Sequence, residues 1–174
     1  MNHRHASHHH VAALTVSLLL AAVSLTVPSC SDNSCYDNGS SLPLVTFYLS
    51  GSQQQVPGLT IMGIGAPGDS LLADSSTLNE IYLPLRATAS TTRYAISRWV
   101  GIGTPMAQQL HDTLTIDYEP VAYFHSAECG AMYNFDIHSA RCTNYGIDSI
   151  QVLNTHVTNS RNPVLRIHFT SFAQ

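Results

Sequence analysis

The seven residues DTLTIDY, from Asp112 to Tyr118, decide the fold class of this chain. Leu114, Ile116 and Tyr118 stand at every second position, with polar residues between them. Because successive side chains of a β-strand point to opposite faces, this spacing buries one face of a strand, whereas a helix would scatter the same side chains around its axis. The stretch therefore predicts a half-buried strand, which Pro120 ends.

The same alternation recurs along the chain, so we expect seven or eight short strands separated by turns. The alternating apolar positions are Val45, Phe47 and Leu49; Leu59 and Ile61; Ile81, Leu83 and Leu85; Tyr94 and Ile96; Tyr133, Phe135 and Ile137; Ile150 and Val152; and Leu165, Ile167 and Phe169. Pro84 places its strand at a sheet edge or a bulge. GIGTPM (101–106) predicts a loop, and MAQQLH (106–111) is the one candidate for a helical turn.

This pattern predicts an all-β fold, a single antiparallel β-sandwich of the immunoglobulin-like or transthyretin-like kind. A small β-barrel is the alternative, since alternation alone does not tell whether a sheet closes. We expect a signal peptide over residues 1–29, a lipidated tether over 30–41 and the sandwich domain over 42–174. The sequence contains no internal repeat.

The N-terminus predicts export. A polar head with Arg4 and five histidines precedes an uncharged apolar stretch from Val11 to Val27, and the small residue Ser29 follows. This arrangement is typical of a secretory signal peptide. An uncleaved anchor helix is the alternative, because the stretch is nearly long enough to span a bilayer. The histidines are expected to leave with the signal rather than bind metal.

Val27-Pro28-Ser29-Cys30 resembles the lipobox of bacterial lipoproteins, whose cysteine becomes the acylated first residue of the mature chain. Ser31-Asp32-Asn33 resembles the acidic export signals that send some lipoproteins to the surface of Gram-negative bacteria. We therefore expect lipidation, such as palmitate, on Cys30, and an outer-membrane lipoprotein facing the periplasm or the cell surface. The alternative is ordinary signal cleavage, with Cys30 left to form a disulfide.

The formal charge of the chain limits the kinds of binding partner that we expect. The residues after Ser29 hold six arginines, eleven acidic side chains and no lysine, which gives a formal charge of −5. A weakly acidic surface without lysine argues against nucleic acid, whose binding depends on phosphate neutralisation. The expected partners are the membrane, through the N-terminal lipid, and an envelope protein or glycan. No cofactor is expected.

Several segments together resemble a known family. They are, in order, a VTFYL strand, IYLPL, DTLTIDYEP, SAECG, GIDSIQVLN and VLRIHF. Their order and spacing are similar to those of small bacterial envelope lipoproteins classed as domain of unknown function family 6452. The resemblance implies export and a compact β domain, and it implies no activity. It also implies a disulfide between Cys35 and Cys129; the alternative pairing is Cys129 with Cys142.

Two motifs invite a catalytic or metal-binding interpretation. Gly68-Asp69-Ser70-Leu71 spells the block of the GDSL esterases, but the sequence lacks the downstream Asp-x-x-His that would activate Ser70. A turn in a β-hairpin is the better interpretation. His125, Glu128, Cys129, His138 and Cys142 include zinc-ligand types, yet no helix is expected to bring them onto one face. We therefore expect no catalytic residue and no metal site.

Asp117 and Glu119 fall on the same face of their strand, where a solvated strand end explains both carboxylates. Three Asp-Ser/Thr-apolar triplets match an O-glycosylation sequon of some Gram-negative envelopes, with acceptors at Ser70, Thr113 and Ser149. The alternative is that these triplets simply open strands.

Two functional classes remain. The first is a non-enzymatic structural or interaction lipoprotein of the cell envelope. The second is a small-ligand module that binds carbohydrate through Trp99, Tyr94, Tyr123 and Tyr133, and it requires these rings to form an exposed patch. An enzyme ranks third, because no nucleophile, base and orienting group stand out together.

Overall fold

The computed structural model of this chain describes residues 41–66, 70–126 and 129–171. The chain divides into two compact units, residues 1–33 and 34–174, and every described residue belongs to the second. The expected signal peptide, Cys30, Cys35 and residues 31–40 of the expected tether lie outside the described residues. Ser41, expected as the last tether residue, is fully buried.

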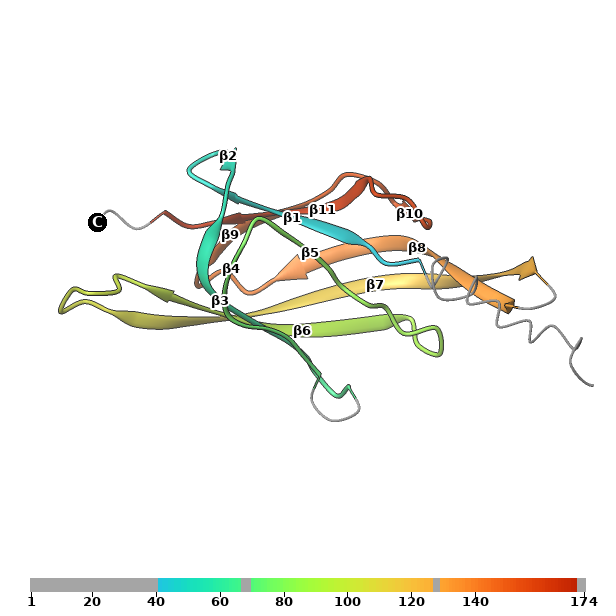
Figure 1. Ribbon diagram of the computed structural model, residues 1–174, viewed down its shortest axis with the longest axis horizontal. Coiled ribbons are helices and arrows are strands. Elements are labelled where there is room, and N and C mark those ends of the chain that lie inside the picture. The colour runs from blue at the N-terminus through green and yellow to red at the C-terminus, as the bar shows by residue number, and fades with distance from the viewer. Residues whose placement is uncertain (1–40, 67–69, 127–128, 172–174) are drawn as a thin grey trace, which may run out of the picture. The chain divides into compact units, whose positions relative to one another are not determined.

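The described part of the chain is built from eleven strands, which Figure 1 labels. They are β1 (Leu44–Leu49), β2 (Ser52–Gln53), β3 (Val56–Gly63), β4 (Leu71–Leu78), β5 (Glu80–Tyr82), β6 (Thr91–Val100), β7 (Gln108–Ser126), β8 (Gly130–Cys142), β9 (Ile147–Val152), β10 (His156–Val157) and β11 (Pro163–Phe169). The described ranges contain no helix with the length and apolar character that a membrane crossing requires.

The strands form two sheets. One has the order β2-β1-β11-β9, with β5 paired to β1, and the other has the order β10-β8-β7-β6-β3-β4. Neither sheet closes on itself, so the fold is the expected sandwich and the barrel alternative is wrong. The first sheet differs from the expectation in one pair, because β1 and β11 run parallel. A parallel pair needs a long connection, and here most of the chain lies between the two strands.

The inner faces of both sheets share one hydrophobic core. The three apolar side chains of DTLTIDY are buried there, as their alternation predicts. Phe47 and Phe169 meet edge to face across β1 and β11, with 5.6 Å between ring centroids. Tyr118 and Phe135 meet in the same way across β7 and β8, at 5.4 Å. Such pairs contribute about 0.5–1.5 kcal/mol beyond their burial.

Two local expectations have opposite outcomes. The strand before Pro84 is confined to the sheet edge, since β5 pairs with β1 off the main order of the sheet. The helical turn expected over 106–111 is wrong, because Gln108 begins β7 and pairs with Val100 of β6. The segment is the returning side of a hairpin, and its pairing with β6 supplies the backbone partners that a helix would have supplied internally.

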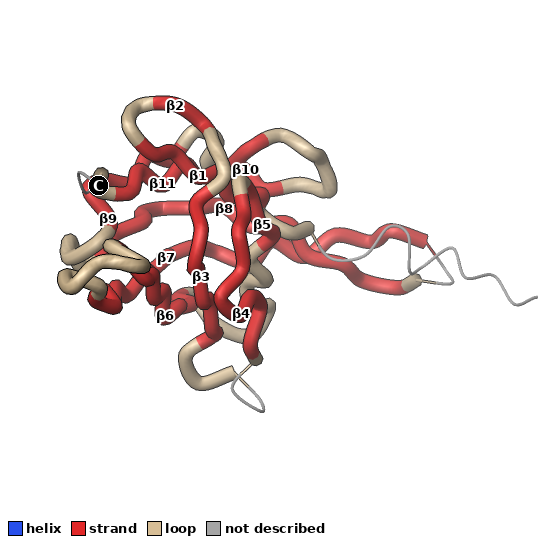
Figure 2. Tube along the Cα trace, turned by 60° about the vertical axis from the view of Figure 1, so that its left-hand side comes forward, coloured by secondary structure: helices blue, strands red, loops and turns tan. Residues whose placement is uncertain are grey.

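Strand β7 is long enough to take part in two projecting hairpins. It pairs with β6 from Gln108 to Asp117 and with β8 from Leu114 to Ser126, so the two pairings overlap between Leu114 and Asp117. We call residues 121–126 and 129–134 the β7–β8 arm, and residues 99–109 the β6–β7 arm. Figure 1 shows the β7–β8 arm as the yellow and orange ribbon pair, and Figure 2 shows it leaving the body of the sandwich.

Candidate functional site

On one face of the β7–β8 arm, which we call the methionine face, Met132 is buried. Tyr123 lies directly opposite Met132, and Val121 lies opposite Asn134, so the four side chains share a face. Met132 is only 9% exposed, although the described arm has just two strands, and Tyr123 Oη contacts its sulfur at 3.7 Å. At the base of this face Ser41 Oγ donates to Asn134 Oδ1 at 2.8 Å. Ser41 therefore lies at the base of the methionine face.

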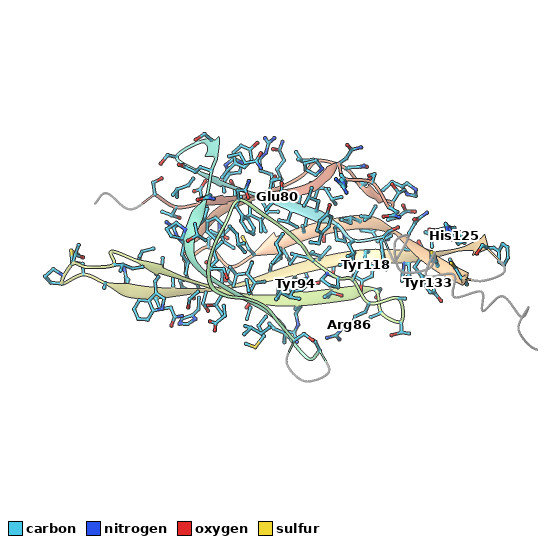
Figure 3. All side chains as sticks on the ribbon, in the orientation of Figure 1. Glu80, Arg86, Tyr94, Tyr118, His125 and Tyr133 are labelled. Atoms are coloured by element: carbon cyan, nitrogen blue, oxygen red, sulfur yellow. The ribbon has the colours of Figure 1, made fainter. Side chains whose placement is uncertain are left out.

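The opposite side of the arm, which we call the phenylalanine face, is exposed to solvent at its outer end. Phe124 lies opposite Ala131, and Ala122 lies opposite Tyr133. Tyr133 still packs against the core cluster, but Phe124, further out, is 73% exposed. Figure 3 labels Tyr133 on the arm, together with His125 near its tip. An apolar row that begins in the core thus continues into solvent.

The cysteines differ in their oxidation state. Cys129, at the arm tip, is disulfide-bonded, whereas Cys142 is a free thiol. The alternative pairing of Cys129 with Cys142 is therefore wrong. The two other cysteines of the chain, Cys30 and Cys35, lie outside the described residues.

Cys142 is held in its protonated form. Burial raises the pKa of its thiol, and the nearby charge of Asp112 raises it further. The thiolate is the nucleophilic and metal-binding form of cysteine. Cys142 is therefore a structural side chain of β8, which packs partly against the core.

A hollow of about 440 Å³ is lined by both Asp117 and Glu119. Asp117 is not a free carboxylate: it accepts hydrogen bonds from Thr91 Oγ1 at 2.9 Å and Ser139 Oγ at 2.8 Å, and it forms an ion pair with Arg141. The bond from Ser139, followed by those from Thr91 and Arg141, lowers the pKa of Asp117. Asp117 therefore ties β7 to β6 and β8, which is more than the solvated strand end that was expected.

Another hollow, of about 240 Å³, lies between the β3–β4 hairpin and the segment after β5. Tyr94 Oη donates to the Pro84 carbonyl, and the Arg86 guanidinium donates to the Ile64 carbonyl at 2.8 Å. Burial, followed by the neighbouring Tyr118, raises the pKa of Tyr94 well above its usual range. Figure 3 shows Arg86, Tyr94 and Tyr118 in this part of the domain. The polar groups here hold the segment after β5 against the sheet.

Ser70 stands in the β3–β4 hairpin, in which Met62 pairs with Leu71. A GDSL-type nucleophile sits on a turn that leads into a helix, whereas Ser70 leads directly into strand β4. The position therefore agrees with the hairpin interpretation. Its sequon partner Asp69 lies outside the described residues.

The zinc-type side chains are distributed over the arm and strand β8. His125 and Cys129 belong to the arm, while His138 and Cys142 follow further along β8. In the described ranges no group of three or more His, Cys, Asp or Glu side chains is placed to hold a metal ion. Glu128 lies outside those ranges.

The four aromatic side chains of the carbohydrate hypothesis do not form one patch. Tyr94 is buried at 2% exposure, while Trp99, on the β6–β7 arm, is 41% exposed. Tyr123 lies on the methionine face and Tyr133 on the phenylalanine face of the other arm. The structure thus places these rings on separate surfaces.

Thr113 and Ser149 are the two acceptors whose whole Asp-Ser/Thr-apolar triplet lies in the described residues, and they differ in their exposure to solvent. Thr113 lies in β7 between β6 and β8, and its sequon partner Asp112 is buried. Ser149 is exposed and lies on β9, the last strand in its sheet. The structure therefore separates the candidates that the sequence treats alike.

Asp112 is the residue whose role sequence reasoning missed. Its carboxylate accepts hydrogen bonds from Thr143 Oγ1 and from the backbone N–H groups of Tyr145, Gly146 and Ile147, at 2.7–3.0 Å. The signal was present in the sequence, because Asp112 shares the parity of the three inward-facing side chains of DTLTIDY. A carboxylate in an inward position of a strand needs buried partners, and the turn after β8 supplies them.

These features define a two-sheet β-sandwich with two projecting hairpins, each of which carries exposed apolar side chains. The chain belongs to a family of unknown function (DUF6452), whose family model matches residues 58–169. The matched range contains both arms. No curated protein and no solved structure matches the chain.

Proposed function

We propose that this protein is an exported lipoprotein, anchored by acyl chains on Cys30 in the outer membrane of a Gram-negative envelope. Its sandwich acts there as a non-enzymatic structural or interaction module. The observation that carries this proposal is the β7–β8 arm, which displays the exposed Phe124 and ends at the disulfide-bonded Cys129. Disulfides persist in oxidising compartments such as the envelope.

We also propose that Cys35 is the partner of Cys129. From Cys129 to Asn134 the arm is five residues long, which is about 17 Å at 3.3 Å per residue. Ser41 is fixed at Asn134 by a hydrogen bond, and the six residues from Ser41 back to Cys35 span at most about 20 Å. The stretch from Cys35 to Ser41 is therefore just long enough for Cys35 to reach Cys129.

A non-enzymatic role is supported by the hydrogen-bond partners of Asp117 and Tyr94, which line the two hollows described above. Asp117 binds Thr91, Ser139 and Arg141. Tyr94 binds the Pro84 carbonyl, and its raised pKa keeps the phenol protonated. A general base needs a free lone pair at a suitable pKa. The side chains of Asp117 and Tyr94 are instead engaged in interactions that join segments of the fold.

The test is a comparison of Cys30→Ser with Cys142→Ser in a Gram-negative host fed with labelled palmitate. We expect the wild-type chain and Cys142→Ser to incorporate the label and to need detergent for extraction from membranes. Cys30→Ser should incorporate none, because the thiol that carries the acyl chains is gone. Equal labelling of all three chains would refute the proposed anchor.

A further inference from the structure

We propose that the tip of the β7–β8 arm is a second membrane contact, where Phe124 inserts into the interface of the bilayer that holds the acyl chains. The inference rests on the proposed function, because it requires the anchor on Cys30 and the bridge from Cys35 to Cys129. It adds a surface of the folded domain to a membrane attachment that otherwise consists of lipid alone.

The first argument is reach. Cys35 is five residues after Cys30, so the two are at most about 17 Å apart. The short stretch from Cys30 to Cys35 thus acts as a leash, and the bridge from Cys35 to Cys129 limits how far the arm tip can lie from the lipid. Phe124 is two residues from Ser126, which pairs with Gly130 at the end of the arm, so it lies about 7 Å along the strand from the tip.

The bridge matters because the next fixed point of the chain is much further from the lipid. Ser41 is held by Asn134 at the base of the arm, and the eleven residues from Cys30 to Ser41 span up to about 38 Å. A leash of that length would let the sandwich present any surface to the bilayer. With the bridge in place, the arm tip is the part of the described domain that stays near the interface.

The second argument is chemistry. Phe124 is 73% exposed, and the described arm residues 121–126 and 129–134 contain no Asp, Glu, Lys or Arg. In the sequence Glu128 is the one acidic residue between them. Aromatic side chains on an uncharged surface favour the membrane interface. The acidic groups that would be repelled by anionic lipids belong mainly to other parts of the domain.

The β6–β7 arm offers a matched control. It also lacks charged residues over 99–109, and Met106 at its turn is 82% exposed. Exposure and polarity are therefore comparable, but this arm has no cysteine to tie it to the lipid. Insertion driven by exposed apolar side chains alone would involve both arms, whereas insertion set by the leash would involve only the β7–β8 arm.

The experiment uses the full lipidated chain in vesicles of phosphatidylethanolamine and phosphatidylglycerol with brominated acyl chains, which quench indole fluorescence on contact. Trp99→Phe removes the single natural tryptophan, and Phe124→Trp or Met106→Trp then introduces one reporter. We expect bromolipid to lower the fluorescence of the Phe124→Trp protein about twofold or more and to leave the Met106→Trp protein unchanged. Adding Cys35→Ser should restore most of the Phe124→Trp signal.

Vesicle flotation separates the two proposals. A chain that fails to float with the vesicles refutes the anchor, and so the proposed function. A chain that floats while Phe124→Trp stays unquenched overturns the arm contact alone and leaves the phenylalanine face to a protein partner or a second copy. Equal quenching of both reporters, or quenching that survives Cys35→Ser unchanged, would also overturn the inference.

Discussion

The Gly146 N–H donates a hydrogen bond of 2.7 Å to Asp112 Oδ2, and this bond joins the two sheets across 34 residues of sequence. Asp112 belongs to β7, and Gly146 stands immediately before β9 of the other sheet. A Cβ on Gly146 would approach Asp112 Oδ2 to 3.2 Å and the Leu110 side chain to 3.1 Å. The close approach of the turn to β7 therefore needs both the carboxylate and the glycine.

This geometry predicts that Asp112→Asn destabilises the domain by about 2–4 kcal/mol, because an amide retains one acceptor oxygen and leaves buried N–H groups without a partner. Urea unfolding of the two chains measures the difference. Asp74→Asn is the matched control, since Asp74 is exposed on β4, and it should change the stability little. A loss below about 1 kcal/mol for Asp112→Asn would show that the turn does not depend on the carboxylate.

The hydrogen bonds of Asp117 predict that the stability of the folded protein depends on pH. Its pKa in the folded protein is lowered, first by Ser139 and then by Thr91 and Arg141. A lowered folded pKa contributes stability that is present above the unfolded pKa of about 3.9 and is lost as the pH falls through the folded value. The stability advantage of the wild-type chain over Asp117→Asn should therefore shrink between about pH 5 and pH 2. An advantage that stays constant over this range would contradict the assignment.

The sequence predicted the sandwich because the inward positions of a strand repeat every two residues. The alternation of Leu114, Ile116 and Tyr118 identified a buried face, and Pro84 marked an edge strand, since its missing N–H weakens pairing. The parallel contact of β1 with β11 was beyond such reasoning. Local alternation states which face is buried but not which distant strand lies alongside.

The candidate site was less predictable for the same reason. The alternation of Tyr133 with Phe135 predicted a strand but not that it would leave the sandwich as an arm. MAQQLH has the composition of a helical turn, yet its pairing with β6 decides its conformation. Strand β4 is not predicted from the sequence because apolar and polar residues alternate only weakly in LLADSSTL. Asp112 was readable from its parity, but its partners come from a turn more than 30 residues away.

The proposed bridge predicts the result of peptide mapping under non-reducing conditions. A linked pair containing Cys35 and Cys129 should be recovered, together with an unpaired peptide containing Cys142. A bridge that closes a loop of this length stabilises the folded protein by about 4–5 kcal/mol in the chain-entropy model, so the bridge should persist in folded protein. Cys142→Ser should leave the map unchanged. Cys35 recovered as a free thiol from envelope-derived protein would remove the bridge.

The sequons predict a preference among acceptors. If an envelope glycosyltransferase modifies the folded chain, the glycan should be found on Ser149, which is exposed, rather than on Thr113, whose neighbour Asp112 is buried. Glycopeptide mass spectrometry of the wild-type chain and of Ser149→Ala measures this preference. A glycan on Thr113 of folded protein would contradict the accessibility argument.

The central claim is that acyl chains on Cys30 hold this protein in the membrane, and the mass of its mature N-terminal peptide tests it most directly. Protein extracted from membranes by detergent should begin at Cys30 and carry acyl chains on that residue, because cleavage after Ser29 creates the new N-terminus. A membrane-extracted chain that retains residues 11–27 and an unmodified Cys30 would show that the anchor is a helix. That result would contradict the lipoprotein account, together with the surface address assigned to Ser31-Asp32-Asn33.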